Sequence, residues 1–196
     1  MPGSDNDNSD FSPAATVTVC GGSGFSHCKY QKYPENEMSI KVGDTVPSGK
    51  FGIMTEAGPG AISTDELFSG KRVAVFSVPG AFTPTCSARH LPGYVEHAAD
   101  LNAKGIDDIA CFAVNDVFVM NAWGKDQNAG SVKMLADGNG DFTKAIGLEL
   151  DATGFGMGMR SKRFAMVVSD GVVESLFIEA PGAFEVSSAE HLLKNL

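Results

Sequence analysis

Beyond residue 70, short apolar runs alternate with longer amphipathic stretches. Five runs are rich in β-branched or aromatic residues and have the length of strands in a covered sheet. Between the first two, apolar residues recur at three- and four-residue steps, which predicts a helix beginning near Cys86, with a kink at Pro92. The alternation favours an α/β fold with a mixed central β-sheet flanked by helices. The predicted strands are Val73–Val78, Ile109–Val114, Val132–Ala136, Phe164–Ser169 and Val172–Ile178.

Two local signals refine the end of the chain. Asp170-Gly171 separates the last two apolar runs. Both residue types tolerate a positive φ, so a tight hairpin with antiparallel strands is predicted there. Ser187 and Glu190 have the spacing of a capping box, which predicts a final helix.

Composition limits the possible classes. The 196 residues, 43% of them hydrophobic and 20% charged, suit one folded globular domain. No apolar run approaches the roughly 20 residues that span a bilayer. The net charge of -9 disfavours nucleic acid and anionic lipid, because lysine and arginine carry affinity for both. We therefore expect a small molecule or a protein thiol as partner, with no nucleic acid and no membrane.

The first 37 residues differ from the rest. They are rich in Gly, Ser, Asn and Asp, and they are interpreted as a flexible extension before a domain that spans residues 38–196. Cys20, His27 and Cys28 lack the paired spacing of a zinc site, so no metal is predicted. The segment has neither the basic start nor the apolar core of a secretory signal, and it is too acidic for a transit peptide. Four cysteines are too sparse for a disulfide scaffold, so a cytoplasmic location is predicted.

Cys86 is the main candidate for chemistry. It follows an apolar strand where a helix should begin, and the unpaired N–H groups and dipole at such a terminus stabilise an anion. A cysteine there can ionise more readily than a free cysteine, whose pKa is about 8.5. Thr83 lies three residues earlier and places a hydroxyl within reach of the sulfur. The alternative is an inert cysteine packed as a small hydrophobic residue.

The order Pro79-x-x-x-Thr83-x-x-Cys86 resembles the active-site signature of peroxiredoxins, and Val78–Ser87 as a whole is similar to their atypical type II branch. The resemblance implies a thioredoxin-like fold. It also implies a cofactor-free, thiol-dependent peroxidase that reduces hydrogen peroxide and alkyl hydroperoxides in antioxidant defence and redox homeostasis. It extends from about Met38 to the C-terminus and is carried by His90–Glu96, Ala113–Val119, Leu135–Gly138 and Arg160–Val168.

The resemblance assigns roles to the residues of the signature. Cys86 is the nucleophile, which peroxide converts to a sulfenic acid. Thr83 hydrogen-bonds to the thiolate or to the peroxide, because a hydroxyl both donates and accepts. Pro79 walls the pocket and excludes water without offering a competing donor. Their simpler roles would be a helix cap for Thr83 and a strand end for Pro79.

A permanent cation is also needed to stabilise the thiolate and polarise the O–O bond. Arg163 is the candidate, because its guanidinium stays protonated and the apolar run after it predicts a rigid strand. Arg160 is the second choice, and Gly154–Gly158 is interpreted as a flexible loop leading to it. His90 lies four residues after Cys86 on the same helical face. It either supports the site or is a structural histidine.

Cys111 lies 25 positions after Cys86 (111 − 86), inside a predicted strand. Plant-like type II peroxiredoxins carry a cysteine at the matching place, so the resemblance makes Cys111 a candidate resolving thiol. A cysteine in a covered strand must emerge by local unfolding, since a disulfide needs Cα atoms within about 7 Å. Otherwise Cys111 is a buried hydrophobic residue, and glutathione, glutaredoxin or thioredoxin resolves the sulfenic acid.

Two rival functions follow from the same cysteine. A dithiol oxidoreductase would need Cys-x-x-Cys, but Thr83 occupies the first of those positions. A redox sensor or relay would pass oxidation from Cys86 to a partner protein, and catalytic turnover with glutathione or glutaredoxin would distinguish it from a peroxidase. The resemblance also implies a homodimer formed through a face near the active site, with Phe82 and Trp123 as contributors.

Overall fold

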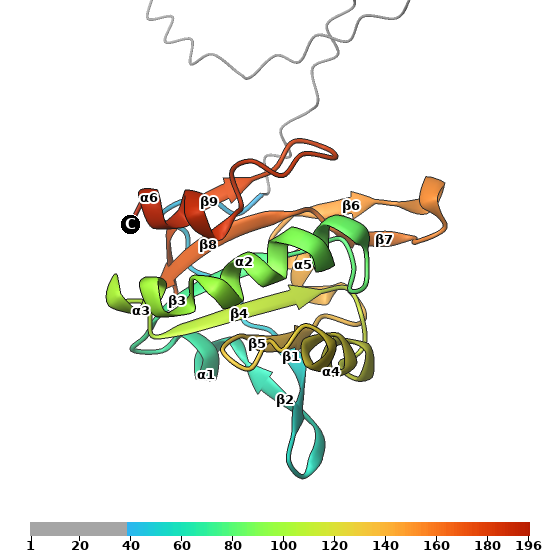
Figure 1. Cartoon of the computed structure of the whole chain (residues 1–196), viewed down its shortest axis with the longest axis horizontal. Helices are drawn as coiled ribbons and strands as arrows, with labels where there is room; N and C mark the ends of the chain where they lie inside the picture. The colour runs from blue at the N-terminus through green and yellow to red at the C-terminus, as the bar shows by residue number, and fades with distance from the viewer. Residues whose placement is uncertain (1–38) are drawn as a thin grey trace, which may run out of the picture. The chain divides into compact units, whose positions relative to one another are not determined.

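A computed structural model describes residues 39–196, which form a layered α/β structure (Figure 1). Within this range, seven strands build one sheet in the order β2-β1-β5-β4-β3-β8-β9, and two more build a small separate ribbon. The strands of the sheet are β1 Lys50–Thr55, β2 Gly58–Ser63, β3 Arg72–Ser77, β4 Asp108–Ala113, β5 Lys133–Ala136, β8 Phe164–Ser169 and β9 Val172–Ile178. The ribbon is β6 Glu149–Asp151 and β7 Met159–Ser161.

The sheet is mixed, as the sequence predicts. Strands β3, β4 and β5 are parallel, whereas β8 runs antiparallel to β3 and β9 antiparallel to β8. These five strands match the five predicted runs to within one residue at either end. The β1–β2 hairpin is not anticipated from the sequence, because β2 contains two glycines and Pro59, which weaken any strand pattern. Proline is tolerated there because β2 is an edge strand.

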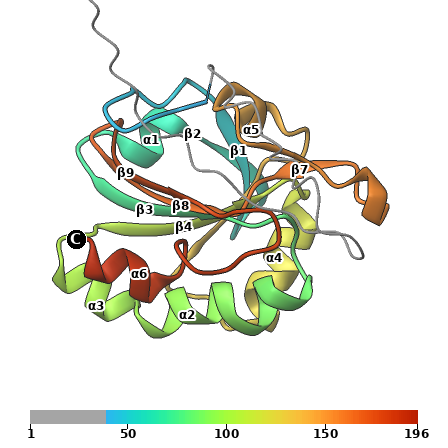
Figure 2. The same cartoon turned by 90° about the horizontal axis from the view of Figure 1, so that it is seen from above.

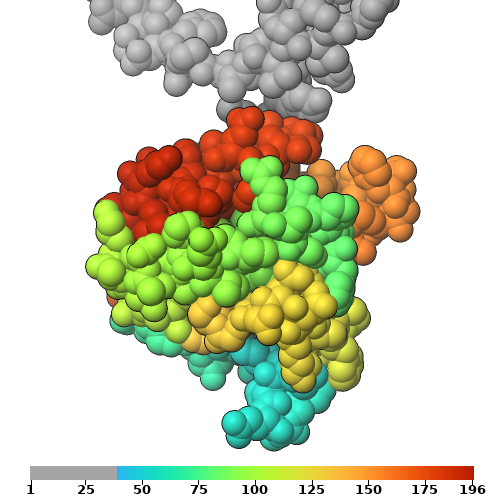
Figure 3. Space-filling model, in the orientation of Figure 1, coloured from blue at the N-terminus to red at the C-terminus, as the bar shows by residue number. Residues whose placement is uncertain are grey.

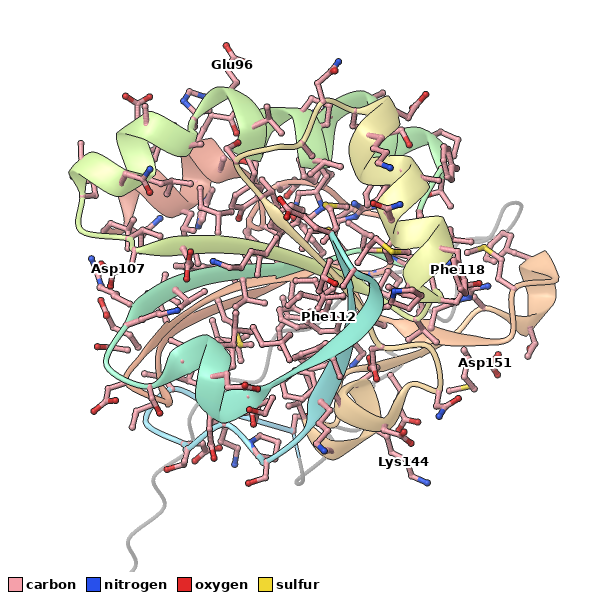
Figure 4. The ribbon with its side chains drawn as sticks, turned by 90° about the horizontal axis from the view of Figure 1, so that it is seen from below. Glu96, Asp107, Phe112, Phe118, Lys144 and Asp151 are labelled. Carbon is pink, nitrogen blue, oxygen red and sulfur yellow. The ribbon has the colours of Figure 1, made fainter. Side chains whose placement is uncertain are left out.

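Helices cover both faces of the sheet (Figure 2). Along each central strand, successive side chains pack alternately into one of two hydrophobic clusters, as expected for strands that are buried on both sides. The first cluster lies under α2, α3, α4 and α6 and contains both Cys86 and Cys111. The second lies under α1 and α5, and Phe112 is at its centre (Figure 4). The helices are α1 Thr64–Phe68, α2 Leu91–Glu96, α3 Ala98–Ala103, α4 Val117–Asp126, α5 Asp141–Ala145 and α6 Ala189–Lys194.

The helix predicted to begin near Cys86 is present, but it is divided. A π-helical turn spans Cys86–His90, in which the Leu91 N–H donates to the Cys86 carbonyl five residues earlier. Pro92 follows in the first turn of α2, and a break at His97 separates α2 from α3. The predicted kink near the proline therefore takes the form of a widened turn, since proline has no N–H to continue the regular pattern.

One predicted turn is confirmed and one predicted cap is wrong. Asp170 and Gly171 have φ values of 47° and 80° and connect the antiparallel strands β8 and β9. The N-cap of α6 is Ser188, whose hydroxyl accepts from the His191 N–H, so the predicted capping box of Ser187 and Glu190 is wrong. The Ser187 hydroxyl instead donates to the buried carboxylate of Glu179, so it does not cap the helix.

Several sequence predictions concern residues 1–38, which lie outside the described range; these include Cys20, His27 and Cys28 and the whole of the predicted extension. None of the helices within residues 39–196 has the length and apolar character needed to cross a membrane. Over the same range, no three histidine, cysteine or acidic side chains come together in a way that could hold a metal ion.

Candidate active site

Cys86 lies where the chain leaves the centre of the sheet and turns into a helix. Strand β3 ends at Ser77, and helical backbone begins at Pro84, a position where the missing N–H of proline costs nothing. The Ser87 N–H donates to the Thr83 carbonyl at 3.0 Å and closes the first turn around Cys86. The side chain of Cys86 is fully buried. The sequence therefore predicts this strand-to-helix junction correctly.

The turn before Cys86 is held in place by neighbouring segments. The Ala81 N–H donates to Asn115 Oδ1 at 3.0 Å, and this contribution of Asn115 is not found by reasoning from the sequence. Phe82 has a φ of 59°, a left-handed conformation that is uncommon for a bulky residue, and its ring is 54% exposed. A Cβ on Gly80 would lie 3.2 Å from Met157 Cε, so close packing here favours glycine.

Two hydrogen-bond donors reach the sulfur of Cys86. Thr83 Oγ1 lies 2.8 Å from Sγ, and Arg163 Nη2 lies 3.3 Å from it. Thr83 also donates to the Gly80 carbonyl at 2.9 Å, so its single proton has two competing acceptors. Pro79 is the second residue after β3 and is partly buried at the start of the same turn. A hydroxyl and a guanidinium on one sulfur are suited to stabilising negative charge there.

The two candidate arginines have different surroundings. Arg163 comes directly before β8, which aims its guanidinium at Cys86 and at His90 Nδ1, 2.9 Å from Nη1. Arg160 lies in β7 and donates to the backbone carbonyls of Met157 and Val114, both at 2.8 Å. Arg160 thus braces the loops beside the site, whereas Arg163 contacts the sulfur.

His90 lies beside Arg163 in the core. Burial lowers the pKa of His90 to about 3, and the positive charge of Arg163 contributes to the lowering. The imidazole is therefore neutral at physiological pH. Its Nε2 is 3.0 Å from the Ser187 carbonyl, which can only accept, so the proton is on Nε2 and Nδ1 accepts from Arg163.

Cys111 occupies the middle of β4, paired with Phe76 of β3 and Met134 of β5, and it is fully buried. Burial raises the pKa of Cys111 well above its usual value, and a negative charge on Cys86 raises it further, although Arg163 opposes both effects. Cys111 is therefore a neutral thiol in this fold. Of the cysteines in the described range, Cys86 and Cys111 are both free.

Trp123, the single tryptophan of the chain, corrects one expectation. Its side chain is fully buried, so in this fold it cannot contribute to a dimer surface. Its indole N–H donates to Ser87 Oγ at 3.0 Å and ties α4 to the helical turn that carries Cys86. The tryptophan therefore belongs to the support of the site.

The sheet order and this single-cysteine turn define a thioredoxin-like oxidoreductase. The redoxin family model matches residues 41–193, and the chain belongs to this family, in which its named relatives are type II peroxiredoxins. It is 48% identical to peroxiredoxin-2B of Arabidopsis thaliana, over 80% of this chain and 98% of the relative. It is also 48% identical to the chloroplastic peroxiredoxin-2E of the same plant, over 81% of this chain and 70% of the relative.

A solved structure agrees with these relatives. Reduced Prx3 from Vibrio vulnificus in complex with hydrogen peroxide has a TM-score of 0.78 and 53% identity, and the match covers 80% of this chain and 98% of that chain. The fold is therefore thioredoxin-like, and the chain is a thiol-dependent peroxidase of the peroxiredoxin class.

Proposed function

We propose that Cys86 is the peroxidatic nucleophile of this enzyme and that its substrates are hydrogen peroxide and alkyl hydroperoxides. The observation that carries the proposal is the pair of donors on its sulfur, Thr83 Oγ1 at 2.8 Å and Arg163 Nη2 at 3.3 Å. The similarity to Vibrio vulnificus Prx3, a protein described in complex with hydrogen peroxide, supports the choice of substrate.

The reaction consumes a thiolate and one peroxide. The Cys86 thiolate attacks one peroxide oxygen, the O–O bond breaks, and the second oxygen leaves as hydroxide or alkoxide and takes up a proton. The sulfur is oxidised to a sulfenic acid, and the departing oxygen becomes water from hydrogen peroxide or an alcohol from an alkyl hydroperoxide. No cofactor is needed, because both electrons come from the sulfur.

Each neighbour of Cys86 has a role in this step. Arg163 stabilises the thiolate and then the charge that develops on the departing oxygen. Thr83 can release the Gly80 carbonyl or the sulfur as charge moves, because its one proton serves either acceptor. Pro79 limits water access at the start of the turn. Arg160 supports this geometry through the loops that it joins.

The sulfenic acid must then be reduced by thiols. Attack by a thiol on the sulfenic sulfur releases water and leaves a disulfide, which a second thiol reduces. Cys111 is a candidate for the first thiol only if β4 opens locally, because it is buried and neutral in the closed fold. Glutathione, glutaredoxin or thioredoxin takes this role if Cys111 remains in place.

We propose a homodimer formed near the active site. Large hydrophobic side chains are exposed on the segments around it, and Phe118, 64% exposed at the start of α4, lies beside the β6–β7 ribbon (Figure 4). Phe155, in the turn that connects β6 to β7, is 87% exposed, Met159 of β7 is 51% exposed, and Phe82, four residues before Cys86, is 54% exposed. Aromatic residues and methionine are enriched at protein–protein interfaces. The proposed location remains the cytoplasm, which imaging of the tagged full-length chain can test.

Turnover with different thiols tests the proposal. Full-length protein is mixed with excess hydrogen peroxide, NADPH and one of two reducing systems, either glutathione with glutaredoxin and glutathione reductase or thioredoxin with its reductase, and NADPH oxidation is followed. We expect many peroxides reduced per protein with at least one of these systems. A single peroxide per protein, with oxidation passed only to another protein, would instead support the redox relay.

A further inference from the structure

We propose that Glu179, which does not contact Cys86, is a positioning residue for peroxide reduction. Its carboxylate orders the loop that follows β9, and the Ser187 carbonyl of that loop fixes the tautomer of His90 that holds Arg163 against Cys86. This inference rests on the roles proposed above for Cys86 and Arg163. It adds a support for the site that is remote from the sulfur.

Glu179 gathers the loop onto one oxygen atom. Its Oε1 accepts from the backbone N–H groups of Glu185, Val186 and Ser187 at 2.7, 2.9 and 2.8 Å, and from Ser187 Oγ at 2.8 Å. Its own N–H donates to the Arg163 carbonyl at 3.0 Å, so Glu179 also contacts the backbone of the residue it serves. Such convergence fixes the path of residues 185–187.

The carboxylate is ionised at neutral pH. Burial alone would raise the pKa of Glu179, but its hydrogen bonds from Ser187, Glu185 and Val186 outweigh burial and lower the pKa below its usual value. An ionised carboxylate only accepts, and its negative charge attracts all four donors to Oε1. The loop is therefore organised around a negative charge that is almost fully buried, since Glu179 is only 8% exposed.

The ordered loop presents the Ser187 carbonyl to the core. This oxygen accepts from His90 Nε2 and from the Tyr94 hydroxyl, both at 3.0 Å, which uses both of its lone pairs. Tyr94 is itself fixed, because its ring stacks on Phe76 with a centroid separation of 3.9 Å. The Ser187 carbonyl is thus held from two sides. Glu179 fixes the backbone that carries it, and Tyr94 of α2 and His90 of the preceding π-helical turn donate to its oxygen.

The orientation of that carbonyl decides where the His90 proton resides. A neutral imidazole carries one proton, and facing a carbonyl it must place that proton on Nε2. Nδ1 is then free to accept from Arg163 Nη1 at 2.9 Å. If the carbonyl moved away, the proton could shift to Nδ1, where it would face the guanidinium, which only donates. Arg163 would then lose one of its fixed partners.

The same loop contacts Arg163 from a second side. The ring of Phe184 lies 5.6 Å from the Arg163 guanidinium carbon and 4.8 Å from that of Arg89, within the range of cation–π interactions. Its centroid is 4.9 Å from that of His90. Figure 3 shows the C-terminal segment lying against the helical segment that begins at Cys86. Glu179 therefore supports the contacts of Arg163 with His90 and with Phe184.

The first experiment compares Glu179→Ala with Glu179→Gln. Alanine removes the acceptor, whereas glutamine can keep a carbonyl oxygen at the position of Oε1. We expect Glu179→Ala to slow Cys86 oxidation by hydrogen peroxide by between about 10- and 100-fold, as for other misplaced catalytic groups. Glutamine should recover most of the rate. Imidazole nitrogen NMR should show the His90 proton on Nε2 in wild type and Glu179→Gln, and a loss of that tautomer in Glu179→Ala.

Asp137→Ala is the matched control for lost stability. Asp137 is also a buried carboxylate, and it accepts from the N–H groups of Phe142 and Thr143 and from the Thr143 hydroxyl, at the start of α5. We expect it to lower the unfolding free energy with little change in the oxidation rate. If Glu179→Ala oxidises as fast as Asp137→Ala, or slows while His90 keeps its tautomer, the positioning role is overturned.

Two adjacent serines provide a second, milder test, which remains valid even if the Glu179→Ala variant does not fold. Ser187→Ala removes one donor to Glu179, whereas Ser188→Ala removes the cap of α6. Loss of the cap should lower the stability of Ser188→Ala, yet we expect Ser187→Ala to slow oxidation more. The reverse order would contradict the proposal. Retained oxidation in Cys86→Ser would instead overturn the proposed function, so the two failures can be told apart.

Discussion

Cys86 and Cys111 pack into the same hydrophobic cluster and are equally buried, but their polar surroundings differ. A hydroxyl and a guanidinium contact the sulfur of Cys86. Cys111 is enclosed between Phe76 and Met134 in the middle of the sheet, where burial favours the neutral thiol. Burial alone therefore does not distinguish the proposed nucleophile Cys86 from the neutral thiol of Cys111.

The contrast arises from backbone position. Cys86 follows the end of a central strand, where the chain leaves the sheet and groups from β8 and the preceding turn can converge on it. Cys111 is inside a strand, where neighbouring strands use the backbone groups and side chains alternate between two apolar layers. A loop end can gather polar side chains, whereas a central strand excludes them.

The largest expected effect comes from exchanging sulfur for oxygen at each position. Cys86→Ser should reduce the rate of peroxide consumption by roughly a thousandfold or more, because the nucleophile is lost. Cys111→Ser should leave the first oxidation of Cys86 within a few-fold of wild type. Stopped-flow measurement with hydrogen peroxide checks both. Equal losses in the two variants would remove the distinction between the cysteines.

A smaller effect separates Arg160, which lies in β7, from Arg163, which directly precedes β8. Arg163→Ala should lower the second-order rate constant for peroxide by about 100- to 1,000-fold, the range expected for a donor that stabilises developing charge. Arg160→Ala should cost less, since Arg160 holds backbone carbonyls instead of the sulfur. Peroxide kinetics with both purified variants, after their unfolding curves are matched, test this order. A greater loss in Arg160→Ala would move the cation to that residue.

The smallest effect is on stability against pH. The folded pKa of His90 is about 3, below its ordinary value of 6.5, so the unfolded chain binds an extra proton between these values. Stability should therefore fall as pH decreases from 6.5 towards 3, by at most about 1.4 kcal/mol per pH unit from this group. His90→Gln should remove that part of the slope, which urea unfolding at several pH values measures.

Cys111 provides the opposite case for the same measurement. Its folded pKa is raised above the ordinary value of 9.0, so the unfolded chain loses a proton that the folded chain keeps. Stability should fall as pH rises above 9, and Cys111→Ala should reduce this alkaline loss without changing the acid slope. An acid slope that is unaltered in His90→Gln would contradict the neutral, buried histidine.

The sequence predicts the chemistry of the site better than its supports. The strand pattern and the Pro79–Cys86 signature suffice for the mixed sheet, the strand-to-helix turn and the choice of Cys86. Arg163 could be named because an apolar strand follows it directly. In each case the information is local, carried by residues within a few positions of one another.

The supports depend on distant contacts, which no local pattern reveals. Asn115 holds the Ala81 N–H from 34 positions away, and the Ser187 carbonyl accepts from His90 at a separation of 97. The capping-box spacing of Ser187 and Glu190 was misleading, because Glu179 takes the Ser187 hydroxyl and Ser188 caps the helix. Trp123 is predicted at a dimer surface but is buried, because its burial depends on how α4 packs, which no local pattern shows.

The most direct test adds one equivalent of hydrogen peroxide to the fully reduced full-length protein without any external thiol. Intact mass and peptide mapping then identify the oxidised residue. The account predicts oxidation at Cys86, as a gain of one oxygen or as a loss of two hydrogens in a Cys86–Cys111 bridge, the second outcome also establishing Cys111 as the resolving thiol. An unmodified Cys86, with oxidation at another residue or none, would contradict it.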